Sequence, residues 1–300
     1  MDGIINVLKP PGMTSHDVVS FIRKCTGIKK VGHTGTLDPG AAGVLPVCIG
    51  KATKVSELLM NDDKGYRAEI QLGITTDTQD GYGNVLSERK VHVNEADIIK
   101  TVNTFIGPIQ QVPPMYSAIK INGQKLYELA RKGMEVKREP RHITIHSINI
   151  IDINLERNTL LIDVRCSKGT YIRTLCCDIG EKLGCGAHMS FLLRTKSGIF
   201  TLDKSVTVET IEQYLKENRI QDLLEPIDSI FKEYPSITVN ASMERKVLNG
   251  NEIDIRHLGP FDKGSEIYRI YNESGRFLCL SKIIQKENNM SFLKIIKSFY

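Results

Sequence analysis

One carboxylate near the start of the chain is placed as a catalytic group would be. Asp38 is the only acid between Asp17 and Glu57, and it lies in a segment, residues 31–54, that contains five glycines. Pro39 holds the backbone of Asp38 in an extended conformation, and the glycines let another backbone approach closely. Because an acid before a proline also commonly begins an ordinary turn, these residues alone leave a catalytic and a structural Asp38 equally open.

The composition is that of a soluble globular protein. The 300 residues, 41% hydrophobic and 25% charged, fit one large domain or a main domain with a small one. No apolar run is long enough for a membrane helix, and the N-terminus lacks the pattern of a signal peptide, so we expect a cytoplasmic protein with no membrane partner. The seven cysteines form no C-x-x-C pair, which indicates reduced thiols and no zinc site.

Apolar spacing predicts the elements that would position Asp38. Predicted strands cover residues 4–8, 66–72, 142–153 and 159–167; predicted helices cover about 15–25, 93–106, 124–132, 171–183 and 207–218. Beyond residues 226–234 the pattern changes to short apolar runs separated by Gly, Asn and Pro, which is typical of a small β-barrel or sandwich. The chain is therefore expected to be an α+β protein with a late β module and a boundary near residue 230.

A basic segment lies between these elements. Residues 120–141 contain seven basic and three acidic side chains, although the net charge of the whole chain is only +5. Such a segment would pair with phosphates of a nucleic acid and make binding salt-dependent. The alternative is a solvated helix face, since Glu128 and Lys132 have the spacing of an ordinary i,i+4 ion pair.

Four blocks of sequence, in order, together carry a resemblance. They are NVLKPPGMTS (residues 6–15), GHTGTLDPGAAG (32–43), LGITTDTQDG (72–81), and SKGTYIRT (167–174) with GCGAH (184–188). Two shorter stretches, PPMYSAIK and YELAR, add to the match. The chain resembles the bacterial tRNA pseudouridine-55 synthases, the TruB family of pseudouridine synthases, densely from residue 4 to about 200 and thinly thereafter.

The resemblance implies a fold and a division into domains. A mixed, mainly antiparallel central sheet flanked by helices, the pseudouridine synthase fold, is expected over residues 1–230. This catalytic domain would include an RNA-clamping insertion at about 119–141. Residues 231–300 would form a small all-β, PUA-like RNA-binding barrel.

The resemblance also implies an activity, the isomerisation of uridine to pseudouridine at position 55 in the T-loop of tRNA. The N-glycosidic bond breaks, the base turns and it rejoins the sugar through carbon. Because nothing is oxidised or hydrolysed, we expect no cofactor and no metal. The partner would be the T-arm stem-loop, whose target base must be flipped out, and the protein would act as a monomer without guide RNA.

Three residues match the catalytic group of that family. Asp38 would act on the ribose, either as a nucleophile or as a base, and Arg173 would pair with it and keep it ionised. Tyr66 would stack on the target base or move a proton. Without the resemblance, Tyr66 would be read as a half-buried strand residue and Arg173 as a surface arginine at the start of a helix.

Seven further residues are expected to bind the substrate. Without the resemblance, each of them would be given an ordinary structural role. His33 would fill the gap left by the flipped base, Leu192 would line the uracil pocket and Tyr171 would support it. The remaining expected contacts to RNA are basic: Lys9, Lys120, Arg131 and Arg141. Leu192 alone would be assigned to the core.

Two other functions stay open at this level. The chain could be chiefly an RNA-binding or tRNA-folding protein whose catalysis is secondary. It could also be a guide-RNA-dependent relative, but the basic insertion argues against that because those relatives lack it.

Overall fold

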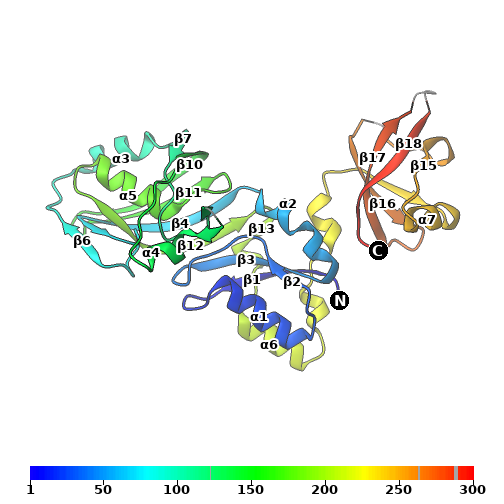
Figure 1. The fold of residues 1–300 in the computed structure, drawn as a ribbon, viewed down its shortest axis with the longest axis horizontal. Helices are drawn as coiled ribbons and strands as arrows, with labels where there is room; N and C mark the ends of the chain where they lie inside the picture. The colour runs from blue at the N-terminus through cyan, green and yellow to red at the C-terminus, as the bar shows by residue number, and fades with distance from the viewer. Residues whose placement is uncertain (122, 263, 287–289) are drawn as a thin grey trace.

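Two β-sheets organise the chain in the computed structural model, which describes residues 1–121, 123–262, 264–286 and 290–300 (Figure 1). Among these residues the larger sheet has nine strands in the order β1-β3-β12-β4-β11-β10-β7, with β2 paired to β3 and β13 paired to β12. Only the β3–β12 pairing is parallel, so the sheet is mixed and mainly antiparallel, as expected. Its strands are β1 (Gly3–Lys9), β2 (Val31–His33), β3 (Ala42–Ile49), β4 (Lys64–Leu72), β7 (Gly107–Gln111), β10 (Arg141–Asn154), β11 (Thr159–Cys166), β12 (Ala187–Ser197) and β13 (Phe200–Thr201).

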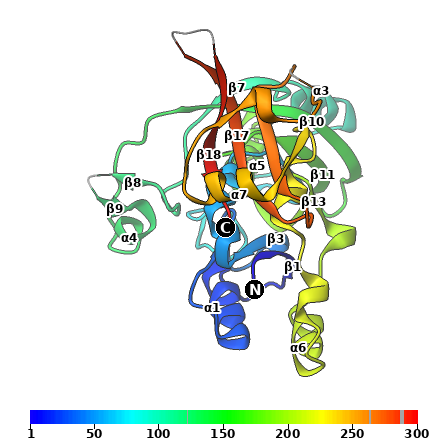
Figure 2. The ribbon, with the colours of Figure 1, turned by 90° about the vertical axis from the view of Figure 1, so that its right-hand side faces the viewer.

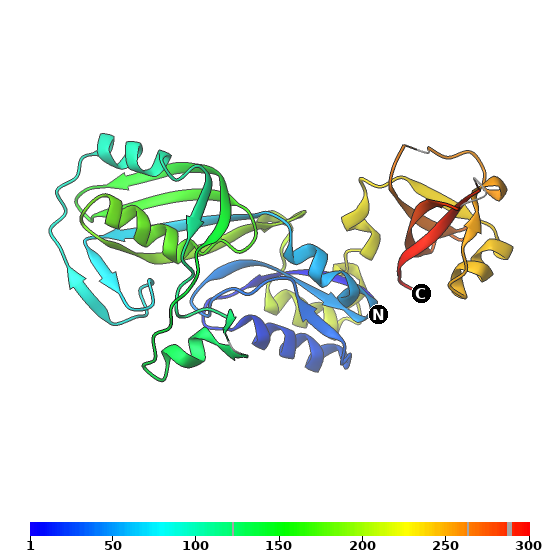
Figure 3. The same cartoon turned by 45° about the horizontal axis from the view of Figure 1, so that its top comes forward.

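Helices cover the two halves of this sheet separately (Figures 1 and 3). The helix α5 (Ile172–Lys182) packs on β4 and β12, and α3 (Glu95–Asn103) packs on β10 and on α5. At the other end, α1 (Ser15–Thr26) and α6 (Val208–Lys216) cover β1 and β2. The α+β class is therefore confirmed.

The ends of α1 follow from its sequence. Thr14 Oγ1 accepts a hydrogen bond from Asp17 N at 3.0 Å, and Asp17 Oδ2 accepts one from Thr14 N at 2.8 Å. This capping box satisfies donors that the first turn leaves free. Gly27, in the left-handed conformation with φ +69°, ends the helix. The helix thereby fixes the segment that leads into the Asp38 loop.

Short elements complete this part of the chain. They are α2 (Ser56–Met60), the hairpin β5 (Ile74–Thr76) with β6 (Val85–Glu88), the hairpin β8 (Lys120–Ile121) with β9 (Gln124–Lys125), α4 (Leu126–Ala130), and the 3₁₀ helices Gly50–Val55, Leu202–Lys204, Ile220–Leu223 and Ile227–Phe231. Figure 2 shows β8, β9 and α4 projecting to one side of the body. None of the described helices is long and apolar enough to span a membrane.

The smaller sheet confirms the predicted late β module. Its strand order is β14-β16-β17-β18-β15, and α7 (Ala241–Leu248) and the 3₁₀ helix Ile255–His257 accompany it. The strands are β14 (Ser236–Val239), β15 (Ile253–Asp254), β16 (Ile267–Asn272), β17 (Phe277–Gln285) and β18 (Ser291–Ser298). The division of the chain into independent domains at residue 230 stays a prediction.

An aromatic cluster joins the two sheets. Phe231 lies 6.3 Å from Phe277 and 6.2 Å from Phe299, and the rings of Phe277 and Phe299 stack at 5.0 Å. Ile4 of β1 and Val44 of β3 belong to the same apolar core. One apolar cluster thus includes side chains of both sheets and of the 3₁₀ helix Ile227–Phe231.

Candidate active site

Asp38 lies on a tight turn between β2 and β3. The turn is closed by a hydrogen bond from Ala41 N to Asp38 O at 3.1 Å, and Gly12 N donates to Pro39 O at 2.8 Å. Leu37 and Ala41, on either side of the acid, are buried in the core of the larger sheet. The turn is therefore anchored at both ends, while the Asp38 side chain keeps 38% of its surface exposed.

Arg173 forms a two-point contact with this carboxylate. Its Nε lies 2.9 Å from Asp38 Oδ2, and its Nη2 lies 3.4 Å from Asp38 Oδ1. The guanidinium also donates to Thr78 O at 2.9 Å and to Tyr116 O at 2.8 Å, and its side chain is only 6% exposed. Arg173 is the second residue of α5. Its side chain therefore connects this helix to three other segments, the Asp38 turn and the backbone at Thr78 and at Tyr116.

Two carboxylates, Asp38 and Asp80, share one cation, Arg173. Burial raises the pKa of the Asp38 carboxyl above its ordinary value, and the Arg173 guanidinium opposes that rise. Asp80 Oδ2 lies 3.7 Å from Arg173 Nη1, so a second carboxylate shares the same cation and pushes the pKa of Asp38 up. A carboxylate with a raised pKa accepts a proton more readily, which suits a group that acts on a sugar.

Tyr66 and Leu192 meet on one face of the sheet. In the pairing of β4 with β12, Tyr66 lies opposite Arg194 and Ala68 lies opposite Leu192. Side chains two residues apart on a strand point to the same face, and Leu192 packs in the same core cluster as Leu37, with Tyr66 against that cluster. The structure therefore brings both predicted residues toward the Asp38 turn.

Arg194 is a site residue that sequence analysis missed. It is 1% exposed, and its Nε donates to Val44 O at 2.7 Å while Nη2 and Nη1 reach Gly35 O at 3.2 Å and Thr36 O at 3.4 Å. Burial raises the pKa of the Tyr66 hydroxyl, and the positive charge of Arg194 opposes that rise. The sequence feature that could have identified Arg194 is its position as a charged residue in an apolar run, FLLRT.

His33 and Tyr171 border the same region. His33 ends β2, is half-buried, and its Nδ1 accepts a hydrogen bond from Gly35 N at 3.2 Å. Burial and the nearby positive charge of Arg194 lower the pKa of His33, so the ring is neutral at neutral pH. Tyr171 caps α5, where its backbone exchanges two hydrogen bonds with the Gln111 amide at 2.8 and 3.1 Å.

Lys9 is placed differently from the expected contact with RNA. Its side chain is fully buried, and Nζ donates to Met13 O at 2.6 Å, Pro10 O at 2.9 Å and Pro39 O at 3.2 Å. Burial lowers the pKa of Lys9 to about 8, although Asp38 opposes the shift. Lys9 therefore holds the Asp38 turn from beneath and has no surface to offer a phosphate.

Two of the other predicted basic contacts lie on or beside the projecting segment, and the third lies in the larger sheet, opposite its edge strand β7. Lys120 is on β8, Arg131 follows α4 and Arg141 begins β10, and all three are exposed. Burial raises the pKa of Tyr171, and the charge of Arg141 is among the groups that oppose the rise, which places Arg141 within electrostatic reach of Tyr171. Figure 2 shows β8, β9 and α4 standing away from the body of the protein.

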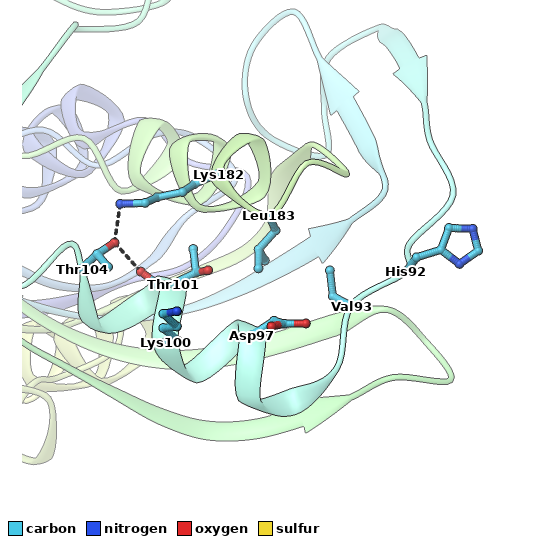
Figure 4. A pocket seen from close by; sticks show the side chains of 8 residues that line it. All are labelled: His92, Val93, Asp97, Lys100, Thr101, Thr104, Lys182 and Leu183. Carbon is cyan, nitrogen blue, oxygen red and sulfur yellow. Dashed lines mark hydrogen bonds between the residues drawn. The ribbon is translucent and has the colours of Figure 1, made fainter.

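A shallow pocket of about 350 Å³ lies elsewhere, between α3 and the end of α5 (Figure 4). Lys182 Nζ donates to Thr104 Oγ1 at 2.7 Å across it, and none of the predicted site residues lines it. In the described part of the chain, no group of three or more His, Cys, Asp or Glu side chains is arranged to hold a metal ion.

Comparison with known proteins gives one consistent family. The model of the TruB family pseudouridylate synthase N-terminal domain matches residues 23–172, and that of the tRNA pseudouridylate synthase B C-terminal domain matches residues 173–232. The tRNA pseudouridine synthase B of Alkaliphilus oremlandii is 49% identical over 100% of this chain and 99% of its own. That of Clostridioides difficile is 46% identical over the full length of both chains.

A solved structure gives the same fold. A chain in a crystal structure of a Cbf5-Nop10-Gar1 complex is 29% identical, with a TM-score of 0.72 over 99% of this chain and 85% of that one. The nine-stranded mixed sheet with its helices and the C-terminal sheet is accordingly the pseudouridine synthase fold. The chain belongs to the TruB family of pseudouridylate synthases and is an isomerase.

Proposed function

We propose that this chain converts uridine to pseudouridine at position 55, in the T-loop of tRNA, as a single protein without guide RNA. The observation that carries the proposal is the Asp38–Arg173 pair, with Nε and Oδ2 2.9 Å apart and the carboxylate still partly exposed. A buried cation and an accessible acid on an anchored turn suit attack on, or deprotonation of, a ribose. Relatives named tRNA pseudouridine synthase B at 46 to 49% identity over the full chain support tRNA as the substrate.

Each of the other residues has a role in this proposal. Arg173 orients the carboxylate and keeps it ionised. Tyr66, which lies opposite Arg194 in the pairing of β4 with β12, stacks on the target base or moves its proton. Leu192 gives the uracil an apolar wall, and Tyr171 supports that wall.

The target uridine must leave the folded T-loop before any chemistry, which costs a few kcal/mol. His33 is neutral and half-buried at the end of β2, so its ring can occupy the space of the flipped base without carrying a charge into the stack. Lys120, Arg131 and Arg141 contact the phosphates of the stem, and the smaller sheet, as a PUA-like module, binds the RNA beyond it.

The experiment is to incubate the purified chain with unmodified tRNA and to map pseudouridine along the product. We expect modification at the T-loop uridine, with no added protein or RNA. A product at another position, or none, would overturn the proposal.

A guide-RNA-dependent activity is the second candidate, because a similar solved chain belongs to a multi-protein complex. The full-length bacterial relatives and the basic segment 120–141 favour the single chain. Activity that appears only after guide RNA and partner proteins are added would establish the second candidate instead.

A tRNA-folding function is compatible with the same basic segment. It differs from catalysis in its dependence on Asp38, since folding needs RNA contacts and not the carboxylate. If the Asp38→Asn protein restores the folding of misfolded tRNA as well as the unmodified protein does, binding has a role of its own.

A further inference from the structure

Tyr82 is an exposed aromatic side chain at the edge of the Asp38 turn. It is 78% exposed, although its ring lies close to Gly40, two residues after the acid. A Cβ built on Gly40 would overlap the ring, lying 2.6 Å from Cζ and 2.7 Å from the hydroxyl oxygen of Tyr82. The end of the ring that carries Cε2, Cζ and the hydroxyl therefore lies against the turn that carries Asp38, and most of the side chain is left to solvent.

Hydrogen bonds within the protein already order the loop that carries Tyr82. Tyr82 N donates to Asp80 Oδ1 at 3.1 Å, and Thr78 Oγ1 donates to the same oxygen at 2.6 Å. Gly81 N donates to Met189 O at 3.0 Å, which ties the loop to β12. Because these bonds fix the backbone, a ligand that packs on the ring pays little to order it.

The charges beside the ring select the kind of ligand. Asp80 lies two residues before Tyr82 and accepts a hydrogen bond from its backbone, and Asp38 lies two residues before Gly40. Arg173 pairs with both carboxylates, and the other cation at this turn, Lys9, is fully buried. A phosphate would be repelled at this position, whereas the neutral face of a nucleobase would not. Stacking on an aromatic ring is the usual way in which proteins hold unpaired bases.

We propose that Tyr82 is a stacking platform for an unpaired nucleobase of the substrate RNA next to the target uridine. The inference rests on the proposed function, because it needs an RNA whose target is presented to Asp38. The ring would hold the neighbouring base while the target enters the site, and so help to select a loop over a duplex.

The first test is substitution of Tyr82 with a matched control on the same hairpin. Tyr82→Ala should weaken affinity for a T-arm stem-loop at least about fivefold, the lower end of what one stacked base contributes. Tyr82→Phe should restore it, because the ring and not the hydroxyl does the stacking. Leu86→Ala, at a position 68% exposed on β6, should leave affinity unchanged.

Two readouts separate stacking from support of the catalytic turn. Loss of a stacked base falls on KM and leaves the salt dependence of binding unchanged, since no phosphate contact is removed. A fall in kcat with unchanged KM would assign Tyr82 to the turn and overturn the inference. Equal affinities of Tyr82→Ala and Leu86→Ala would also overturn it.

A second test uses the absence of tryptophan from the sequence. Tyr82→Trp places a single indole at this position, and its fluorescence should be quenched on addition of the T-arm RNA. Leu86→Trp, the control, should show little change. If the unsubstituted protein modifies the T-loop but Tyr82→Trp is not quenched, the inference fails while the proposed function stands.

Discussion

Replacing Arg173 by methionine tests how the site controls the ionisation of Asp38. The substitution keeps a long, flexible apolar side chain on α5 but removes the guanidinium whose Nε lies 2.9 Å from Asp38 Oδ2. Burial already raises the pKa of Asp38, and Arg173 is the strongest group that opposes the rise. The pKa of Asp38 should therefore increase further in the variant.

The size of the effect follows from the geometry. Opposite charges about 4 Å apart interact by about 4 kcal/mol at an effective dielectric of about 20. Because Asp38 is 38% exposed, we halve this figure to about 2 kcal/mol for solvent screening. That corresponds to about 1.5 pKa units.

Two assays read this shift. The acid limb of the kcat/KM profile should move to higher pH by about 1.5 units, because the ionised carboxylate is the active form. The second assay is the stability of the folded protein. A carboxyl whose pKa is raised in the native state stabilises the fold at low pH, and this contribution is lost as the pH rises through that pKa. The free energy of unfolding of Arg173→Met should therefore fall below that of the unsubstituted protein at pH 7, and the gap should narrow on acidification.

The control is an arginine–aspartate pair outside the site. Arg67 on β4 contacts Asp163 on β11 through two bonds of 2.7 Å, and both side chains are partly exposed. Arg67→Met should change stability by at most about 1 kcal/mol and leave the pH profile in place. An acid limb that Arg173→Met does not move would refute the assignment of Arg173 as the group that keeps Asp38 ionised.

Three further predictions follow from buried or half-buried groups. The pKa of Lys9 is about 8 in the folded state against an ordinary 10.5, so the unfolded state binds more protons between these values. The free energy of unfolding, relative to Lys9→Met, should rise by about 1.4 kcal/mol per pH unit in that window, and a flat difference would contradict the burial of the charge. His33→Ala should lower kcat/KM on folded tRNA at least about fivefold, and His33→Phe should restore it, because a ring must replace the flipped base. The fluorescence of a 2-aminopurine placed beside the target uridine would report the flipping. Phe299→Ala should cost about 3 kcal/mol in chemical denaturation, and Phe292→Ala, half-exposed on β18, should cost clearly less.

The parts of the fold that sequence predicted are those with local signals. The capping box at Thr14 and Asp17 and the glycine after the helix define α1 within a few residues. In α5, the buried apolar residues Ile172, Leu175, Cys176 and Ile179 follow the period of a helix. These patterns need no information from distant parts of the chain.

Two strands beside the site, β3 and β12, were missed by sequence analysis. β12 contains bulges between Met189 and Phe191 and between Arg194 and Lys196, which break the alternation of buried and exposed residues. β3 contains Gly43 and Pro46, which usually mark turns or edge strands, yet it lies between β1 and β12. Its parallel pairing joins residues about 150 positions apart, which no local pattern reveals.

The buried cations were also beyond sequence analysis. Lysine and arginine are rarely fully buried, so Lys9 was expected to contact RNA and Arg194 was not considered. Both are stabilised by backbone carbonyls of the Asp38 loop and β3, a set of partners that only the folded chain assembles.

The central claim is that Asp38 performs the chemistry on a T-loop uridine. The most direct test compares Asp38→Asn with Asp152→Asn, an exposed aspartate on β10, on a T-arm stem-loop labelled with tritium at the carbon that forms the new bond. Asp38→Asn should release no tritium while binding the RNA within about tenfold of the unsubstituted protein, a difference of about 1.4 kcal/mol, and Asp152→Asn should release it normally. Tritium release by Asp38→Asn at the normal rate would contradict the account.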